Sequence, residues 1–335
     1  MADVFAQSII QVDNSTLLGV SSKNLGRLKS FSKNYNLNDK YCFRSYEALL
    51  SCGEIEIVYI ALPNSIHHKW IVKCIEAGKH ILVEKPATTN SSELKDIKNK
   101  LKTKSLFFCE GFMYLHHPRT QQFLSTVKNG SIGEPMEMET SFGCKILEKE
   151  GPFQRIKNQF KKEPRQFNKS LGGGSILDLG CYLTSLSLII AKIKSSHEVD
   201  AVSCEKTEIN YESKKVDVEA QTELLFGNGF KSRIQTSFQT DLGQRTYILG
   251  SKGKMVIENT WGCTCDVFSC NENYIKIKNT IFDNPYSYQI FNISNWLIQG
   301  FEKPQNPAFT LVESLENMWI LDKWRSSLSM KSSNR

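Results

Sequence analysis

A carboxylate and a phenol stand four residues apart in the stretch LGGGSILDLGCYLTSL. They are Asp178 and Tyr182. Residues at this spacing share one face of a helix, and most of their neighbours are apolar. A charged group on such a helix is costly unless it has a partner or a function. The pair therefore marks a candidate functional site.

A lysine follows a short apolar run in the stretch HILVEKPA, where Glu84, Lys85 and Pro86 end a predicted strand. Proline fixes φ and often holds a tight turn. The backbone of a lysine next to this proline is restricted, so its side chain points in one direction. The alternative is an ordinary strand exit with a solvated lysine, and the motif alone leaves both interpretations open.

Polar residues also follow the apolar run IEIVYIALP, where Asn64 and His67 lie just past a predicted parallel strand. Open α/β sheets bind their ligands at the carboxyl ends of such strands. The glycines 172–174 have no buried strand before them. They indicate a close-packed entry to a helix and not a phosphate cradle.

The first third of the chain alternates predicted strands and helices, which indicates a Rossmann-type, doubly wound parallel sheet. Later segments such as PMEMETSFG and GFKSRIQTSFQ alternate apolar and polar residues. They are typical of a large, mostly antiparallel sheet with one solvated face. We expect a dinucleotide-binding domain over 1–118, a substrate and oligomerisation domain over 119–328, and a frayed tail over 329–335. The predicted strands of the first part are Thr16–Ser22, Ile55–Pro63, His80–Glu84 and Ser105–Glu110.

Charge and cysteine content exclude several functional classes. The 335 residues carry a net charge of +7, but the lysines are dispersed, so we expect no nucleic-acid partner. The cluster Cys263, Cys265 and Cys270 has no second half and no nearby histidine, so we expect no metal. Polar residues interrupt the longest apolar stretch, which predicts no membrane span, and the N-terminus has no signal-peptide pattern. We expect a cytoplasmic protein.

These motifs, taken in order along nearly the whole chain, resemble the glucose–fructose oxidoreductase/inositol dehydrogenase (Gfo/Idh/MocA) family. The dihydrodiol dehydrogenase and xylose dehydrogenase-like branch is the most similar. The resembling segments are IALPNSIHHKWIVKCIEAGKHILVEKPATT, EGFMYLHHPRTQ, RQFNKSLGGGSILDLGCY, SKGKMVIENTW and ENMWILDKWR.

The resemblance implies an NADP-dependent oxidoreductase acting on a secondary hydroxyl or hemiacetal carbon of a sugar, cyclitol or dihydrodiol. Lys85 would polarise the substrate oxygen, Asp178 would orient substrate or relay a proton, and Tyr182 would be the acid–base group. Its pKa would need to be lowered by Lys85. Arg165 and His117 would lie on the substrate side, while Leu115 stands where many members have arginine. The implied cofactor contacts are Leu62, Asn64, His67, Glu84 and Lys85.

The cofactor preference depends on the end of the second family strand, where NAD binders usually place an acidic residue. This chain has Ser21, Ser22 and Lys23 there. Hydroxyls with a cation suit a 2′-phosphate, which favours NADP over NAD, although NAD stays possible. A simple capped loop is the alternative, because Ser22 and Asn24 are both good helix caps.

The opening MADVFAQSII resembles the first helix of the family, so Met1 falls on the fifth position of the glycine fingerprint G-x-G-x-x-A. The first strand and both leading glycines have no counterpart. One explanation is a late start, which the retained catalytic pattern favours. The other is a short chain that lost cofactor binding and became a regulatory or partner-binding protein. We also expect a homodimer or homotetramer formed through the antiparallel sheet.

Overall fold

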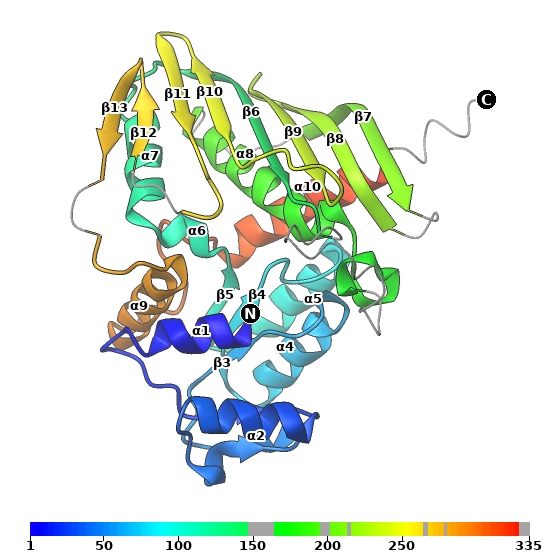
Figure 1. Cartoon of the computed structure of the whole chain (residues 1–335), viewed down its shortest axis with the longest axis vertical. Coiled ribbons are helices and arrows are strands. Elements are labelled where there is room, and N and C mark those ends of the chain that lie inside the picture. The colour runs from blue at the N-terminus through cyan, green and yellow to red at the C-terminus, as the bar shows by residue number, and fades with distance from the viewer. Residues whose placement is uncertain (147–163, 195–201, 213–215, 264–266, 278–279, 328–335) are drawn as a thin grey trace, which may run out of the picture.

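In the described part of the chain, the strands form one large, mostly antiparallel sheet and one parallel sheet that is divided into two smaller pieces (Figure 1). The computed structural model describes residues 1–146, 164–194, 202–212, 216–263, 267–277 and 280–327. Most of the loop 144–164, the tail 329–335 and Cys265 lie outside these residues. The fold class predicted from the sequence is confirmed.

The parallel sheet consists of two separate pieces. One has two strands, β1 and β2, and the other has three in the order β3-β4-β5. All pairs within each piece are parallel. The bounds are β1 Val20–Ser21, β2 Cys42–Phe43, β3 Ile57–Ile60, β4 His80–Glu84 and β5 Phe108–Gly111.

The predicted strand Thr16–Ser22 is too long, because only Val20 and Ser21 form β1. In the described part of the chain, Thr16, Leu17 and Leu18 make no backbone–backbone hydrogen bond. A strand exists only where a neighbour completes its ladder, and β1 has a neighbour only in the two-residue β2.

Helices cover both faces of the parallel sheet, as a doubly wound fold requires. Within β4, Leu82 packs in one cluster with Phe5 of α1, while Ile81 and Val83 pack in the main core with Trp70 of α4. The strand is therefore buried on both faces, as its unbroken apolar run predicts. The helices of this part are α1 Ala2–Ile9, α2 Leu25–Asn34, α3 Tyr46–Leu50, α4 His67–Glu76, α5 Ser91–Leu101 and α6 Met113–His116, with short 3₁₀ turns at Asp39–Tyr41 and Asn64–Ile66.

The large sheet has eight strands in the order β13-β12-β11-β10-β6-β9-β8-β7. Among the strands that the structure describes here, only β6 and β9 form a parallel pair. The predicted hairpin at 227–229 joins β8 to β9. The bounds are β6 Pro135–Gly143, β7 Val202–Glu212, β8 Val216–Phe226, β9 Lys231–Ser237, β10 Thr246–Gly250, β11 Gly253–Ile257, β12 Val267–Cys270 and β13 Asn273–Lys276.

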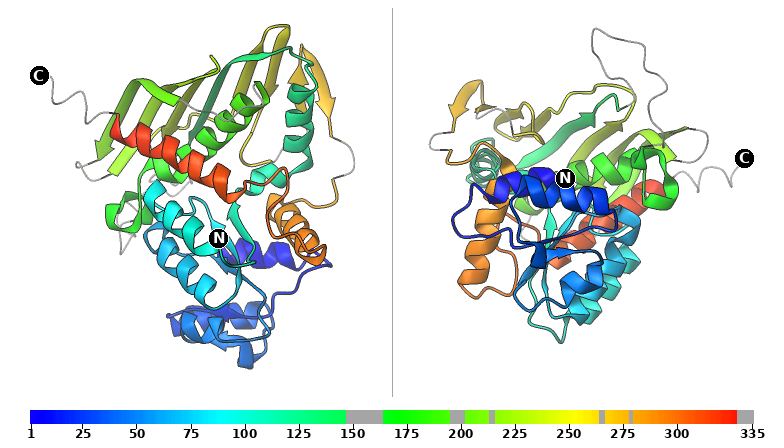
Figure 2. Two further views of the ribbon diagram at one scale, coloured as in Figure 1. Left: turned by 180° about the vertical axis from the view of Figure 1, so that it is seen from behind. Right: turned by 60° about the horizontal axis from the view of Figure 1, so that its bottom comes forward.

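Helices α8 and α10 lie between the two sheets, and α10 crosses from α8 to α5 (Figure 2). Helix α9 packs against α1, so Tyr286 and Ile290 belong to the same apolar cluster as Phe5. A segment from the C-terminal half thus completes the core of the parallel sheet. The domain boundary at residue 118 stays a prediction. The remaining helices are α7 Pro118–Lys128, α8 Cys181–Lys194, α9 Pro285–Ile298 and α10 Leu311–Ser326, with 3₁₀ turns at Arg165–Phe167 and Lys169–Leu171 and a π-helical turn at Ile176–Gly180.

One helical stretch, Lys169–Lys194, is long and apolar enough to cross a membrane by length and composition, but 83% of its most apolar window is buried inside the protein. The core helix of a soluble protein passes the same test. Its apolar surface is already covered, mainly by the large sheet and α10.

Candidate active site

Lys85 lies directly after β4 and faces the turn that precedes α8. Its ammonium donates a hydrogen bond to the backbone carbonyl of Asp178 at 2.6 Å and lies 3.4 Å from the Asp178 carboxylate. Nζ also lies 4.7 Å from the ring centroid of Tyr182. The structure thus brings together the three residues predicted to carry the chemistry.

The Asp178 carboxylate forms ion pairs with two side chains. Its Oδ1 is 3.4 Å from the Lys85 ammonium and 3.4 Å from the Arg165 guanidinium. Arg165 in turn lies 3.4 Å from the Asn64 side-chain oxygen. Asn64 donates to the carbonyl of Gly172 at 3.1 Å, which ties the loop after β3 to the segment before α8. Four of the predicted site residues therefore form one connected polar cluster.

The two charges of the Lys85–Asp178 pair stabilise each other. Burial alone lowers the pKa of Lys85, but the Asp178 carboxylate raises it, and the net shift is upward. Burial raises the pKa of Asp178, whereas Lys85 and Arg165 lower it, and the net shift is downward. The ammonium and the carboxylate both stay charged around neutral pH, so Lys85 can donate hydrogen bonds but cannot act as a base.

Tyr182 is buried and its phenol points to the thioether sulfur of Met113, with 3.6 Å between Oη and Sδ. Burial raises the pKa of Tyr182 well above its usual range, and the Glu84 carboxylate adds to the effect. The predicted lowering by Lys85 is therefore wrong, because burial outweighs any effect of the ammonium, which lies over the ring. A neutral phenol on a weak sulfur acceptor is suited to donate a hydrogen bond to a ligand.

Aromatic rings surround Tyr182, and the sequence analysis missed them. Four ring centroids lie 5.6–5.8 Å from that of Tyr182. They come from the residue that follows β5, from α6, from β6 and from the turn after β11, so no spacing in the sequence could reveal that these four rings surround Tyr182. Trp261 is delivered by a turn whose three carbonyls accept hydrogen bonds from the buried Arg119. The four rings are Phe112, Tyr114, Phe142 and Trp261.

The turn that holds Lys85 is fixed by a buried carboxylate, which the sequence analysis also missed. Glu110 Oε1 accepts the backbone N–H of Ala87 at 2.8 Å, two residues beyond Lys85. Burial raises the pKa of Glu110 to about 7. Glu110 is the first residue of the EGFM motif, but the sequence does not show that it accepts a hydrogen bond from Ala87.

This raised pKa predicts a pH-dependent stability. Because the folded pKa of Glu110 lies above its unfolded value, its contribution to stability falls as pH rises from about 4.5 past 7, by up to about 3 kcal/mol. We expect Glu110→Gln, which keeps the acceptor for Ala87, to flatten the Tm profile between pH 5.5 and 8. Thermal unfolding measures both profiles, with the exposed Glu302→Gln as control. A Glu110→Gln profile as steep as that of the parent would contradict this origin.

The glycines 172–174 serve close packing, as predicted. A Cβ on Gly172 would lie 2.9 Å from the Asn64 side chain, and one on Gly173 would lie 2.4 Å from the carbonyl oxygen of Gln166. Gly174 has φ +116°, and its Cβ would lie 2.3 Å from the Asp217 carboxylate. The Gly174 carbonyl accepts the N–H of Asp178 at 3.0 Å. The glycines thus set the backbone that delivers Asp178.

Gly174→Ala should destabilise the protein by about 3 kcal/mol, because it adds a clash to an unfavourable φ. Gly130→Ala is the matched control, since Gly130 also has a positive φ of +77° but would place its Cβ in open space. It should cost only about 1 kcal/mol. Chemical denaturation measures both values. Equal losses of unfolding free energy in the two variants would show that the clash with Asp217 does not contribute to the destabilisation.

The other predicted cofactor contacts lie around the carboxyl ends of β1, β3 and β4. His67 is fully buried, with its ring nitrogens 2.8 Å from the Leu62 carbonyl and 3.0 Å from the Pro86 carbonyl. It braces the loops after β3 and β4. Glu84 is buried and accepts a short hydrogen bond from the Tyr59 hydroxyl. These two residues thus contact the protein itself, and their contact with the cofactor stays a prediction.

The end of β1 is compatible with a dinucleotide. Ser21 Oγ is buried and, among the described residues, has no hydrogen-bond partner. Ser22 Oγ accepts the N–H of Asn24, and Lys23 is exposed. An unsatisfied hydroxyl two residues from an exposed lysine fits the polar ribose end of a nucleotide. The capped loop is also present, so a capped loop and a contact with the cofactor can both occur at the end of β1.

His117 takes a different place from the Lys85 cluster. Its Nδ1 accepts the N–H of Arg119 at 3.2 Å at the start of α7, and its buried ring packs edge-on against Tyr288 at 5.3 Å. Leu115 is buried in the main core. These contacts give His117 a visible role as a helix cap, and its substrate role stays a prediction.

A Rossmann-type sheet with a lysine, an aspartate and a tyrosine gathered beyond its carboxyl ends defines a dinucleotide-dependent oxidoreductase. Residues 1–112 match the model of the oxidoreductase family with an NAD-binding Rossmann fold, and residues 120–256 match the Gfo/Idh/MocA C-terminal domain. The chain belongs to the Gfo/Idh/MocA oxidoreductase family. It is an NAD(P)-dependent enzyme of the kind that acts on sugar or diol hydroxyls.

Curated relatives extend over most of the chain. The trans-1,2-dihydrobenzene-1,2-diol dehydrogenase of Xenopus tropicalis is 23% identical over 327 residues, which cover 96% of this chain and 92% of the relative. The dTDP-3,4-didehydro-2,6-dideoxy-alpha-D-glucose 3-reductase of Saccharopolyspora spinosa is 26% identical over 263 residues, covering 76% and 70%.

Solved structures share the fold. A 3-ketoreductase from Actinomadura kijaniata in complex with NADP and TDP-benzene matches with a TM-score of 0.76 and 20% identity, covering 96% of this chain and 92% of that one. The aldose-aldose oxidoreductase from Caulobacter crescentus complexed with glycerol matches with a TM-score of 0.81 and 19% identity, covering 98% and 94%.

Proposed function

We propose that this enzyme transfers hydride between NADP and a secondary hydroxyl or hemiacetal carbon of a sugar, cyclitol or dihydrodiol. The observation that carries the proposal is the contact of the Lys85 ammonium with both Asp178 and the ring of Tyr182. It places a fixed cation beside a neutral phenol, and together they can bind one substrate oxygen.

The roles follow from charge and position. The nicotinamide, when bound, supplies or accepts the hydride. Lys85 donates a hydrogen bond to the substrate oxygen and stabilises negative charge that develops there. Asp178 keeps Lys85 charged and aimed, and Arg165 helps to hold that carboxylate. Tyr182 donates its proton to the same oxygen as a carbonyl is reduced. Its raised pKa favours this direction, because the phenol remains protonated at neutral pH.

The surroundings support a polyol substrate. The polar cluster of Lys85, Asp178, Arg165 and Asn64 offers several donors and acceptors on one side. The aromatic wall around Tyr182 offers an apolar face on the other. Sugars and dihydrodiols carry both kinds of surface, with hydroxyls at their edges and C–H groups on their faces.

For cofactor preference, we expect Lys23→Ala to weaken NADPH binding about tenfold and to leave NADH binding unchanged, because only NADPH carries the 2′-phosphate. Nucleotide fluorescence titration measures both dissociation constants. Lys33→Ala, an exposed lysine of α2, is the control. Equal weakening of both nucleotides would contradict contact between Lys23 and the 2′-phosphate.

The function is tested by NADPH oxidation with keto sugars and by NADP reduction with aldoses, inositols and dihydrodiols. The proposal expects turnover with at least one member of this panel and transfer of deuterium from labelled NADPH to the product carbon. Binding of NADPH without turnover on any of these classes would contradict the proposed substrate class.

Assembly and location extend the proposal. The face of the large sheet away from α8 exposes Met136 and Leu249 among paired charges such as Arg233 with Glu139. Such a broad face suits association of two or four copies, and we expect the enzyme in the cytoplasm. Light scattering after size-exclusion chromatography would give twice or four times 38.2 kDa.

A further inference from the structure

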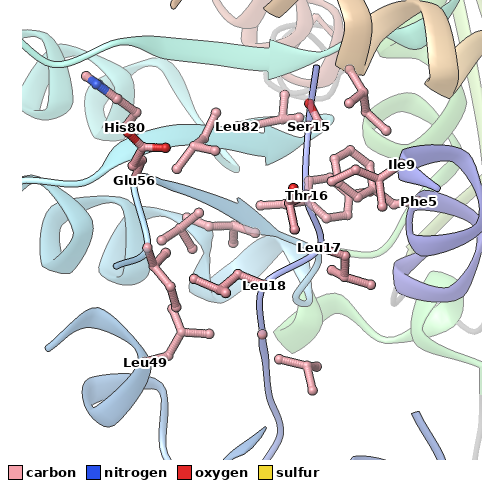
Figure 3. Close-up of a pocket in the computed structure, with 18 of the residues that line it drawn as sticks. Phe5, Ile9, Ser15, Thr16, Leu17, Leu18, Leu49, Glu56, His80 and Leu82 are labelled. Carbon is pink, nitrogen blue, oxygen red and sulfur yellow. The ribbon is translucent and has the colours of Figure 1, made fainter. Parts of the chain in front are cut away.

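The carboxylate of Glu110 is enclosed in the protein interior. Glu110 is 2% exposed and lies on β5, whose neighbour in the parallel sheet is β4. The cavity of about 900 Å³ in Figure 3 lies between β1 and β3, and its described lining residues do not include Glu110. Glu110 therefore acts through its contacts within the protein.

Glu110 is linked to Lys85 by two observations. Its Oε1 accepts the N–H of Ala87 at 2.8 Å, so the backbone two residues beyond Lys85 is held from β5. The Lys85 ammonium also opposes the rise in the pKa of Glu110 that burial causes, which places the two charges near each other. Glu110 thus holds the turn and lies near the ammonium that the turn presents.

Helix α10 supplies the next contact of Glu110. Ser314 is 1% exposed, and its nearby hydroxyl also opposes the rise in the pKa of Glu110. Glu110 Oε2 and Ser314 Oγ are both buried, and neither forms a hydrogen bond of good geometry with any described residue. Buried polar atoms need a partner. Because a hydroxyl can donate to a carboxylate or accept from a carboxylic acid, Ser314 is suited to orient Glu110 in either state.

The same helix holds the far end of the segment that follows the turn. Arg325 Nη1 donates to the Thr89 carbonyl at 2.8 Å, and Asp322 Oδ2 accepts the N–H of Ser91 at 2.8 Å. The segment is therefore fixed at one end by Glu110 of β5 and at the other end by α10.

Helix α10 also contacts the segment that delivers Asp178. Asn317 Nδ2 donates to the Cys181 carbonyl at 3.3 Å. The Trp324 ring packs on Gly180 so closely that a Cβ there would lie 2.8 Å from the ring. One helix thus contacts the segments that present both members of the ion pair at the active site.

We propose that Glu110 is a positioning residue for Lys85 and that Ser314 of α10 orients it. Glu110 fixes the place of the ammonium against Asp178 by holding the N–H of Ala87. The inference rests on the proposed role of Lys85 at the substrate oxygen and adds the groups that aim this ammonium. Misplacement of a reacting group by about 1 Å can cost about 10²-fold in rate, so loss of the hydrogen bond to Ala87 should be seen in kcat.

The test compares Glu110→Met with Glu110→Gln. Methionine has a similar volume and removes the acceptor, and apolar side chains of similar volume often replace buried charged groups without loss of stability. Glutamine keeps an oxygen for the N–H of Ala87. We expect kcat to fall about 10–10²-fold in Glu110→Met and less than about threefold in Glu110→Gln. Hydrogen exchange at the Ala87 amide should accelerate at least about tenfold in Glu110→Met only.

A double variant separates positioning from a general structural defect. Because Glu110 acts through Lys85, Lys85→Met/Glu110→Met should lose no more kcat than Lys85→Met alone, whereas an independent defect would add its own loss. Ser314→Ala should lower kcat about three- to tenfold, which is the effect of one hydrogen bond. Glu302→Met, at an exposed position, is the control and should match the parent.

A parental kcat in a folded Glu110→Met enzyme overturns the proposal, and so does a loss in Glu110→Gln as large as that in Glu110→Met. Additive losses in the double variant also overturn it, and a parental kcat in Ser314→Ala overturns the part assigned to Ser314. Exchange at Ala87 needs no substrate. It therefore tests the link to the turn separately from turnover, whose absence in the parent enzyme would contradict the proposed function. Unchanged exchange at Ala87 in Glu110→Met overturns the link.

Discussion

Lys85→Met should lower kcat/KM by about 10²–10³-fold and leave the fold intact. The ammonium is the only cation that contacts both Asp178 and the Tyr182 ring within the described residues. Its loss removes charge stabilisation at the substrate oxygen, an effect that typically costs about 3–4 kcal/mol in the transition state. Methionine keeps most of the apolar stem, so the packing under the turn is retained. Steady-state kinetics measures the loss.

Two comparisons separate this effect from unfolding. Lys104→Met changes an exposed lysine of similar chemistry and should retain full activity. Arg165 remains beside Asp178 in the Lys85→Met variant, so the carboxylate keeps one cation, and Tm should fall by only a few degrees. Full turnover in a folded Lys85→Met protein would remove Lys85 from the mechanism.

Tyr182→Phe should lower kcat for carbonyl reduction by about 10²–10³-fold, because it removes only the proton donor. The ring remains, and so do its contacts with Phe112 and Trp261 and its position under Lys85. The phenol gives up only a hydrogen bond to sulfur, so stability should change little. Rates of NADPH oxidation with the best substrate measure the effect.

The pH profile gives an independent check on the same residue. Because burial raises the pKa of Tyr182, the phenol stays protonated as pH rises through neutrality, and the reduction rate should show no loss from Tyr182 below pH 10. Tyr274→Phe, at a fully exposed tyrosine, is the control and should match the parent. A Tyr182→Phe enzyme with parental kcat would require another proton donor.

The sequence predicted which polar residues would lie close together, because each of them follows a recognisable element. Lys85 ends a strand, Asp178 and Tyr182 share a helical face, and Arg165 and Asn64 lie in motifs with fixed order. The aromatic wall and Glu110 could not be predicted in the same way. The partner of Glu110 is Ala87, which follows β4, and two of the rings around Tyr182 come from β6 and from the turn at Trp261. These segments meet only when both sheets are assembled.

The sequence also could not predict whether the pKa of Tyr182 is raised or lowered. Spacing brings a lysine and a tyrosine together, but it does not tell whether the ammonium meets the hydroxyl or the ring face. The ring contact leaves desolvation to dominate, and desolvation raises the pKa of a phenol.

The fold class followed from alternation of strands and helices, and later from period-two segments. The lengths of the strands could not be predicted from these patterns. Thr16–Leu18 has the composition of a strand but no neighbour on which to build a ladder, so only β1 forms. Helix α9 packs on the parallel sheet although it comes from the far end of the chain, a contact that local patterns do not encode.

The central claim is that this chain binds NADP beside Lys85 and uses it on a polyol carbon. The most direct measurement is a fluorescence titration of the 335-residue chain with NADPH and with NADH, followed by the addition of keto sugars. The account predicts micromolar binding of NADPH, weaker binding of NADH, and loss of the reduced-nucleotide signal once a substrate is added. No binding of either nucleotide at millimolar concentration, by a protein shown to be folded, would contradict it.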